Sequence, residues 1–286
     1  MHRLPRVALI TLLIACAHAA PPTSTTGTTA TSPRKALPDG PPLATPGEHM
    51  QYALSLRGVD LATYDIAIAD VTTVAGKSAL LVQSHAKVTG FAALVADIDD
   101  QFTSWVDVTN GRSLRFQTDE YASGSKTDLE HVIVDLAARA GDAIPITLQV
   151  NDVTIKTETQ RASQPIVWDH NALLLALRAW EAPTGTRLAL EVFRSRYMWH
   201  VDVTIGGKEN HVTALGDFPA LRIDGAAHRL DRKGARDASS APRTFTMWIS
   251  DDDGRVPLEI LATTDYGDLR MAIIDYQPGS GNRLRL

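Results

Sequence analysis

Apolar and polar residues alternate along most of the chain from residue 47 onward, which is the pattern of β-strands that bury one face. The first such run places Tyr52, Leu54 and Leu56 at every second position. Short turns rich in Gly, Asn and Asp separate the runs, and the pair Asn110-Gly111 is a strong signal for a tight hairpin. The pattern therefore predicts a mainly β protein built as a meander of antiparallel strands.

A strongly patterned hairpin is predicted over residues 248–257. Met247 and Ile249 end one alternating run, and an acidic turn closed by Gly254 leads into the next. Asp side chains accept hydrogen bonds from nearby backbone amides and glycine adopts positive φ, so the segment suits a chain reversal. The carboxylates of 251–253 also suggest calcium, but they lack the alternating spacing and the distal Glu of an EF-hand loop. We interpret them as a solvated turn.

One segment, residues 169–181, has the clear spacing of a helix. Leu173, Leu177 and Trp180 recur at steps of three and four residues and would line one face. Asp169 is of the residue type that caps helix N-termini, because its carboxylate can accept a hydrogen bond from a free amide of the first turn. We predict a helix here, with Trp180 in its apolar stripe.

Residues 122–141 carry two conflicting signals. Leu129, Val132 and Leu136 fall at helical spacing, and a capping box precedes them. The β-branched run Val132-Ile133-Val134 instead favours a strand between the hairpins on either side. We predict a second helix over this segment and keep a strand as the alternative.

The N-terminus has the form of an export signal. Arg3 and Arg6 precede an apolar run that is too short to cross a bilayer as a helix. The sequence Leu-Ile-Ala-Cys ending at Cys16 then resembles the lipobox of bacterial lipoproteins, in which a signal peptidase cuts before the Cys and a diacylglycerol is attached to its sulfur. Cys16 is the only cysteine of the chain and lies where a lipobox requires it. We predict a signal peptide over 1–15 and lipidation of Cys16.

A second cleavage site competes with the lipobox. Ala17-His18-Ala19 fits an ordinary signal peptidase, which would release a soluble periplasmic protein without a cysteine. If lipidation holds, Ala17 after the Cys favours the outer membrane, facing the periplasm, under the familiar sorting rule. The expected membrane partner is therefore the lipid anchor itself.

Composition divides the chain after the signal. Residues 16–46 are rich in Pro, Thr, Ser and Ala and hold almost no large apolar side chain, so we predict a disordered tether. Residues 47–277 carry the strand pattern and form one β-rich domain of a size that buries a substantial core. Residues 278–286 are a C-terminal tail.

Charge and motifs exclude several function classes. The net charge is -5 and Lys and Arg are scattered, so the basic patch of a nucleic-acid binder is missing and we predict no nucleic-acid partner. The nine histidines form no zinc-binding pair at helical spacing, and the sequence has no nucleophile elbow, Walker loop or dinucleotide glycine string. We predict a non-enzymatic protein without metal or cofactor, while a triad whose members meet only in space stays open.

Four soft motifs occur together in a fixed order. They are Gly47-Glu48 followed by Tyr52, the block from Asp99 to Asp107, the helix from Asn171 to Arg178 and the hairpin 248–257. Together they resemble the domain-of-unknown-function family 3108, a group of bacterial exported β-rich proteins, over about 47–276 except 122–165. The resemblance implies a curled antiparallel sheet or open β-barrel with one or two helices packed against it, similar to lipoprotein carriers of the envelope. It implies no known reaction.

Two functions fit these expectations. The first is the binding of a lipid or other hydrophobic ligand in a cavity between helix and sheet, for which we predict the lining residues Trp180, Leu177, Trp105 and Trp248. The alternative is a structural or protein-interaction module of the envelope that acts through a sheet edge or a surface patch. A solvent-open cavity beside Trp180 would favour the first function, and a filled core would favour the second.

Overall fold

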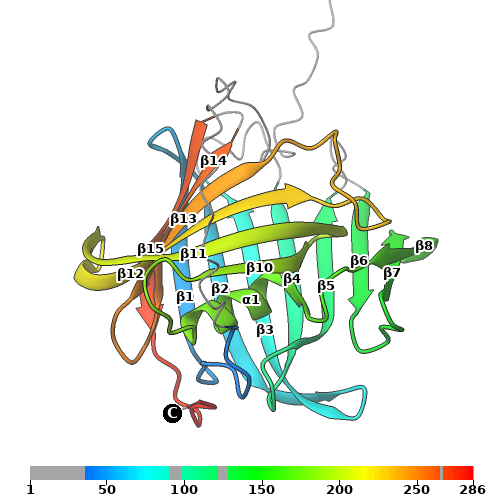
Figure 1. The fold of residues 1–286 in the computed structure, drawn as a ribbon, viewed down its shortest axis with the longest axis horizontal. Coiled ribbons are helices and arrows are strands. Elements are labelled where there is room, and N and C mark those ends of the chain that lie inside the picture. The colour runs from blue at the N-terminus through cyan, green and yellow to red at the C-terminus, as the bar shows by residue number, and fades with distance from the viewer. Residues whose placement is uncertain (1–35, 90–97, 122–127, 265–266, 286) are drawn as a thin grey trace, which may run out of the picture.

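The computed structural model describes residues 36–89, 98–121, 128–264 and 267–285. Within these ranges, fifteen strands form one large curled sheet around one helix, α1 (His170–Arg178) (Figure 1). This arrangement confirms the predicted fold class, a mainly β protein with a curled antiparallel sheet and a helix packed against it. The strands are β1 (His49–Leu56), β2 (Val59–Val74), β3 (Lys77–Val88), β4 (Asp99–Asp107), β5 (Ser113–Tyr121), β6 (Leu129–Asp135), β7 (Ala143–Val150), β8 (Val153–Arg161), β9 (Val167–Asp169), β10 (Arg187–Arg194), β11 (Tyr197–Thr213), β12 (Gly216–Arg229), β13 (Arg243–Ser250), β14 (Pro257–Thr264) and β15 (Gly267–Gln277).

Strands that are neighbours in the sheet are mostly consecutive in the chain, as a meander requires. From one edge the order runs from β8 back to β1, and it then continues from β15 back to β9. β1 and β15 pair antiparallel, with His49 opposite Gln277, and join the two halves of the sheet. At the second edge, β9 pairs parallel to β10. The described domain therefore begins and ends in the middle of the sheet.

The inner face of the curl is apolar and packs around α1. Residues of α1 from Asn171 to Arg178 are all buried, so the sheet surrounds this helix. Alternate residues of the strands point inward and join the same core, among them Ile66 and Leu80. Trp180, which follows α1, is 0% exposed and belongs to this core as well. Side chains of the helix and the sheet thus fill the centre of the curl.

A second apolar cluster lies where the curled sheet packs against itself. Phe102, Phe116 and Ile146, from β4, β5 and β7, pack with Phe193 of β10 and Met198 of β11. These strands are far apart in the order of the sheet, so the cluster holds its two halves together as layers.

A buried polar network fixes the start of α1. As predicted, Asp169 is the N-cap, and its Oδ1 accepts the Ala172 N–H at 2.9 Å and the Ser104 hydroxyl at 2.8 Å. The Asn171 amide group bonds Ser104 at 3.1 Å and Ser84 at 3.0 Å. These bonds attach the helix to β3 and β4 and satisfy polar groups that burial removes from water. The helix ends at Arg178, earlier than the predicted 181.

His170, the first residue of α1, lies beside the same network. Its Nε2 is 3.3 Å from the Tyr64 hydroxyl and 3.4 Å from that of Ser84. Burial lowers the pKa of His170 to about 3, and the charge of Arg194 acts in the same direction. The unfolded chain takes up a proton near the ordinary pKa of 6.5, well above the pKa in the folded state. The contribution of His170 to stability is therefore complete above pH 6.5 and is lost as the pH falls towards 3.

We expect the variant His170→Gln to gain stability relative to the wild type as the pH falls from 7 to 4. The difference should grow by at most about 1.4 kcal/mol per pH unit, because one proton is linked to unfolding. Urea unfolding of both proteins at several pH values measures it. A difference that stays constant over this range would contradict the assignment.

The predicted helix over 122–141 is wrong where the structure describes it. Residues 129–135 form β6, which pairs with β5 and β7, while 122–127 lie outside the described residues. Val132 and Val134 are buried and Ile133 between them is not, which is strand alternation. The helical spacing was a local signal, and hydrogen-bond partners on both sides override it.

The end of the predicted tether packs against the domain. Leu43 and Ala44 are buried, and the Leu284 N–H donates to the carbonyl of Ala44 at 3.0 Å. The guanidinium of Arg285 donates to the carbonyl of Pro41 at 2.6 Å. Residues 36–46 and the predicted C-terminal tail therefore hold each other in place, because each supplies backbone partners to the other.

The predicted signal peptide, Cys16 and the tether up to residue 35 lie outside the described residues. Lipidation of Cys16 therefore stays a prediction. In the part of the chain that the structure describes, no helix is long and apolar enough to cross a bilayer.

Candidate functional site

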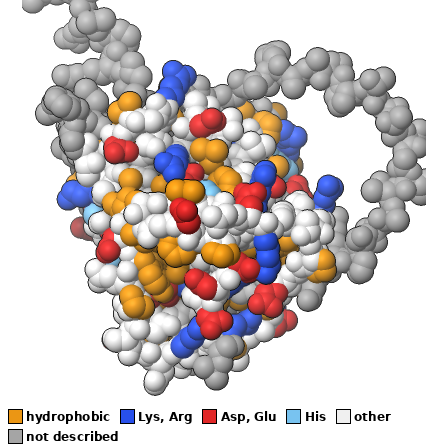
Figure 2. Space-filling model, turned by 90° about the vertical axis from the view of Figure 1, so that its left-hand side faces the viewer, with side chains coloured by type: hydrophobic (Ala, Val, Ile, Leu, Met, Phe, Trp, Pro, Cys, Tyr) orange, Lys and Arg blue, Asp and Glu red, His pale blue; other side chains and the backbone are white. Residues whose placement is uncertain are grey.

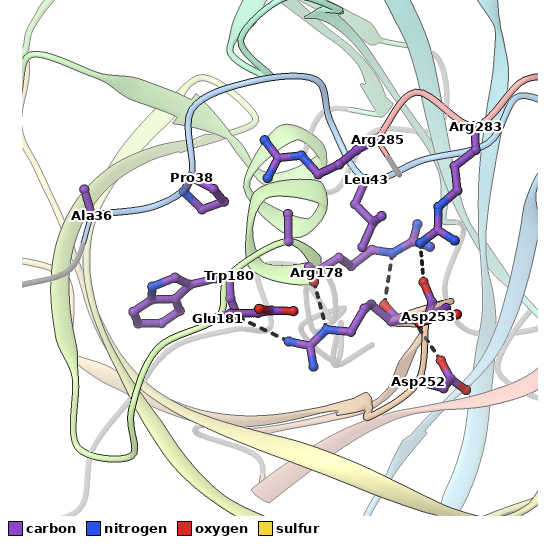
Figure 3. A pocket seen from close by; sticks show the side chains of 12 residues that line it. Ala36, Pro38, Leu43, Arg178, Trp180, Glu181, Asp252, Asp253, Arg283 and Arg285 are labelled. Atoms are coloured by element: carbon purple, nitrogen blue, oxygen red, sulfur yellow. Dashed lines mark hydrogen bonds between the residues drawn. The ribbon is translucent and has the colours of Figure 1, made fainter.

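A pocket of about 460 Å³ opens at the C-terminal end of α1 (Figure 3). Four segments that are distant in sequence meet there: the end of α1, the turn between β13 and β14, the N-terminal segment 36–43 and the C-terminal segment 283–285. The residues lining it are Ala36, Pro38, Leu43, Arg178, Ala179, Trp180, Glu181, Asp252, Asp253, Arg255, Arg283 and Arg285. Charged side chains dominate this lining.

Arg178, the last residue of α1, forms a buried ion pair at the base of the pocket. Its Nη2 lies 2.6 Å from Oε1 of Glu48, and both side chains are almost fully buried, at 3% and 2% exposed. Its guanidinium also donates to the carbonyls of Gly254 and Arg255. The Tyr276 hydroxyl donates to the same Glu48 carboxylate at 3.2 Å. One ion pair thus connects α1, the start of β1, β15 and the turn after β13.

The side chain of Arg255 donates hydrogen bonds to backbone carbonyls at the end of α1. Its Nε donates to the carbonyl of Arg178 at 3.0 Å and its Nη2 to that of Trp180 at 3.2 Å. These carbonyls lie at the end of α1, where no further helical turn supplies a donor. The Asp252 carboxylate accepts the N–H groups of Gly254 and Arg255, which holds Arg255 at a positive φ of 49°. The acidic turn that we predicted therefore exists, and its structural role is to place Arg255 beneath the helix.

Two further arginines at the rim are already hydrogen-bonded. Arg283 donates to the carbonyl of Asp253, and Arg285 donates to the carbonyls of Pro41 and Asp39. The lining thus holds four arginines and three acidic residues, most of them tied to neighbouring groups. In the described residues, no group of three or more His, Cys, Asp and Glu is arranged to hold a metal ion. The geometry of this pocket serves to join both ends of the domain to α1.

Of the four residues predicted to line a ligand cavity, the structure brings Leu177 and Trp180 together, and the Trp180 backbone N–H donates to the carbonyl of Leu177 at 3.1 Å. Leu177 and Trp180 lie in the core, at 1% and 0% exposed. Trp105 lies between the buried residues Ser104 and Val106 of β4, so alternation places its side chain on the outer face of the sheet. Trp248 is also on the outer face, where its indole stacks on His211 at 4.6 Å between ring centroids.

The pairing of Arg178 with Glu48 and the role of Arg255 were missed by sequence reasoning. The paired residues are 130 positions apart, and neither belongs to a motif for ion pairing. The outward direction of Trp105 and Trp248, in contrast, was available from the alternation of apolar neighbours along each strand.

A second candidate site is the edge of the sheet formed by β8. This strand pairs with β7 and with no other named strand of the described sheet. Val153 and Ile155 are 63% and 59% exposed, which is unusual for β-branched side chains. At the other edge, the three residues of β9 are all buried. β8 is therefore the accessible edge, and an open edge can accept another strand.

The outer face on the left of Figure 1 shows no concentration of one type of side chain. Figure 2 shows this face, on which acidic, basic and apolar side chains are interspersed. Such a mixture is typical of a solvated surface.

Solved structures share the fold at low sequence identity. A beta-barrel-like protein of the domain of unknown function DUF1849 from Brucella abortus has a TM-score of 0.53 and 9% identity, covering 83% of this chain and 99% of that one. An exported protein with a YmcC-like fold from Bacteroides fragilis, so described provisionally, scores 0.35 at 6% identity over 84% and 99% of the two chains. A protein from Parabacteroides distasonis, provisionally described as a lipoprotein, scores 0.34 at 7% identity over 84% and 100%. The first likeness concerns the fold alone, and the other two scores are too low to support an argument.

Sequence comparison identifies the family. No curated protein matches this chain. The family model described as "Protein of unknown function (DUF3108)" matches residues 51–274, from within β1 to within β15, and so spans nearly the whole curled sheet. The chain therefore belongs to the DUF3108 family, as its sequence motifs predicted.

Proposed function

We propose that this protein is a non-enzymatic lipoprotein of the cell envelope whose β-rich domain binds another protein through the open edge of its sheet. The observation that carries the proposal is the filled curl. The helix α1 and Trp180 occupy the space in which a carrier of hydrophobic molecules would hold its ligand.

The pocket beside Trp180 fits a hydrophobic ligand poorly. Its lining is mainly charged, and the Arg178 and Arg255 guanidinium groups are bonded to protein carbonyls and carboxylates. An acyl chain gains little from contact with such groups and would remove them from water. Lipid binding, the first function considered from the sequence, is therefore the weaker candidate.

The edge strand β8 supports protein binding. An extended segment of a partner can add to an exposed edge by main-chain hydrogen bonds, with side-chain contacts on both faces. Val153 and Ile155 supply exposed apolar surface at this edge.

We place the membrane anchor on the side of the pocket at the end of α1. Ala36, the first described residue, lies at the pocket where α1 ends, and the predicted tether reaches the domain there. Lipidation of Cys16 would hold this end towards the membrane, and Ala17 after the Cys favours the outer membrane.

Replacement of Cys16 by Ala is expected to release the protein from the membrane. In a bacterial host, the wild-type chain should carry a diacylglyceryl group by intact mass and partition with outer-membrane vesicles, whereas the variant should do neither. A wild-type mature chain that starts at Ala20 would contradict the anchor.

The same preparation separates the two candidate functions. Native mass spectrometry of the detergent-extracted wild-type chain is expected to show the covalent lipid and no further lipid. One non-covalently bound lipid for each chain would overturn the interaction proposal and favour a carrier.

A further inference from the structure

The hydrogen bonds at the end of β8 show which of its backbone groups face the open edge. The Ala162 N–H donates to the carbonyl of Asp142, on the side of β7. The preceding Arg161 N–H donates to Arg232, on the opposite side. Backbone groups of successive strand residues point to alternate sides, and the register with β7 is regular from Arg161 back to Lys156. The N–H and C=O of Thr157 and Thr159 therefore face outward.

We propose that this edge pairs with the β8 edge of a second copy of the chain, antiparallel and with a two-fold axis at Thr157. This inference rests on the proposed function and names its partner. The two Thr157 residues would exchange both of their N–H···O=C bonds across the axis, because a residue on the two-fold pairs with its own copy. The two sheets would then continue into one another.

Charge selects this register over its neighbours. Side chains on one face of β8 must lie opposite side chains on the same face of the other copy. The two-fold axis must therefore pass through a residue and not between two residues, and the positions near the centre are Lys156, Thr157 and Glu158. An axis at Lys156 places the two lysines opposite each other, and an axis at Glu158 does the same for the two glutamates. The axis at Thr157 places each Lys156 opposite the Glu158 of the other copy, twice. In the single chain these two side chains already pair with each other, and Glu158 also pairs with Arg232, so the contacts across the axis would extend an existing charge network. Opposite charges stabilise a cross-strand pair and like charges destabilise it.

The composition of β8 also suits pairing. Val153, Ile155, Thr157 and Thr159 are β-branched and exposed, and this residue type favours the extended backbone. In the proposed register, Ile155 lies opposite Thr159 of the other copy. Pairing would cover part of the Ile155 side chain, which is 59% exposed in the single chain.

The paired segment is short. Arg161 already uses its N–H for the contact with the loop at Arg232, so the new ladder extends only from Ile155 to Thr159. An interface of this length is small compared with those of stable dimers. The lipid anchor offsets this limit, because confinement to a membrane raises the effective concentration of the copies. We expect pairing on the membrane and mostly monomers in dilute detergent solution.

A cysteine placed on the axis tests the register. In membranes that contain the full-length chain, Thr157→Cys should form an intermolecular disulfide under mild oxidation, because hydrogen-bonded antiparallel partners have Cα atoms about 5.5 Å apart. Thr159→Cys is the matched control: the residue type is the same, and Thr159 is also exposed and on the same face, but its copy lies about 13 Å away along the strands. The wild-type chain controls for Cys16. Equal cross-linking of the two variants, or none in Thr157→Cys, would overturn the proposal.

Charge variants provide an independent test. In the Thr157→Cys background, Lys156→Glu alone and Glu158→Lys alone should each reduce the disulfide-linked dimer at least several-fold, because each places like charges opposite each other. Co-expression of these two variants should restore the dimer, as every opposed pair then joins a Glu with a Lys. Failure of the mixture to exceed the single variants would contradict the register.

The outcome also separates this inference from the function on which it rests. A photo-reactive residue at Ile155 that links to a different envelope protein, with no link between copies, would overturn self-pairing and leave edge binding intact. Non-covalent lipid in the purified chain would instead remove the proposed function itself.

Discussion

Substitution of Arg178 by Met is expected to lower the free energy of unfolding by about 3–5 kcal/mol, because it leaves the Glu48 carboxylate buried without its partner. The carboxylate is 2% exposed, so water cannot replace the lost guanidinium. The carbonyls of Gly254 and Arg255 would lose their donor in the same step. Equilibrium unfolding in urea measures the loss, which should appear as a lower midpoint with little change in slope.

Two further variants show whether the loss comes from the ion pair. The double variant Arg178→Met with Glu48→Gln should recover a substantial part of the stability, because no charge then stays buried alone. Arg283→Met, in the same pocket but exposed, should change stability by no more than about 0.5 kcal/mol. Similar losses of unfolding free energy in the Arg283 and Arg178 variants would show that stability depends on the total charge of the pocket and not on the buried ion pair.

Substitution of Trp180 by Ala is expected to lower the free energy of unfolding by about 3–5 kcal/mol, because it removes a fully buried side chain of the core and leaves a cavity. Trp180→Phe should cost less, about 1–2 kcal/mol, since it keeps most of the apolar volume and the indole Nε1 makes no hydrogen bond among the described groups. Thermal or urea unfolding of the three proteins ranks them.

The alternative role for Trp180 makes the opposite prediction. A residue that lines a ligand cavity can be truncated with little loss of stability in the ligand-free protein, while bound ligand is lost. A stable Trp180→Ala protein would therefore contradict the filled curl on which the proposed function depends.

Local patterns in the sequence were sufficient for the hairpins and for α1. Alternation marks strands because each strand buries one face, and Asp169 could be identified as a cap because its hydrogen bond is made three residues away. Over 122–141 the same local reasoning failed, because Val132 and Val134 owe their strand conformation to partners in β5 and β7. A helical spacing of apolar residues cannot report such partners.

The candidate sites also depend mainly on long-range contacts that local sequence patterns do not contain. Exposure of β8 follows from its position at the end of the strand order, which no local pattern contains. The pocket at the end of α1 depends on contacts between residues that lie 30 to 246 positions apart. What could have been read in advance is the outward direction of Trp105, because its buried neighbours Ser104 and Val106 have the opposite parity.

The pairing of β1 with β15 has a consequence for when the sheet can form during synthesis. The first strand, β1, pairs with β2 on one side and with the last strand, β15, on the other. Glu48 and Tyr276, whose side chains form a hydrogen bond near this pairing, are 228 residues apart. During synthesis, the sheet therefore cannot close until the final strand has been made. If the chain is exported as we propose, β1 and β15 can pair only after the last residues have crossed the membrane.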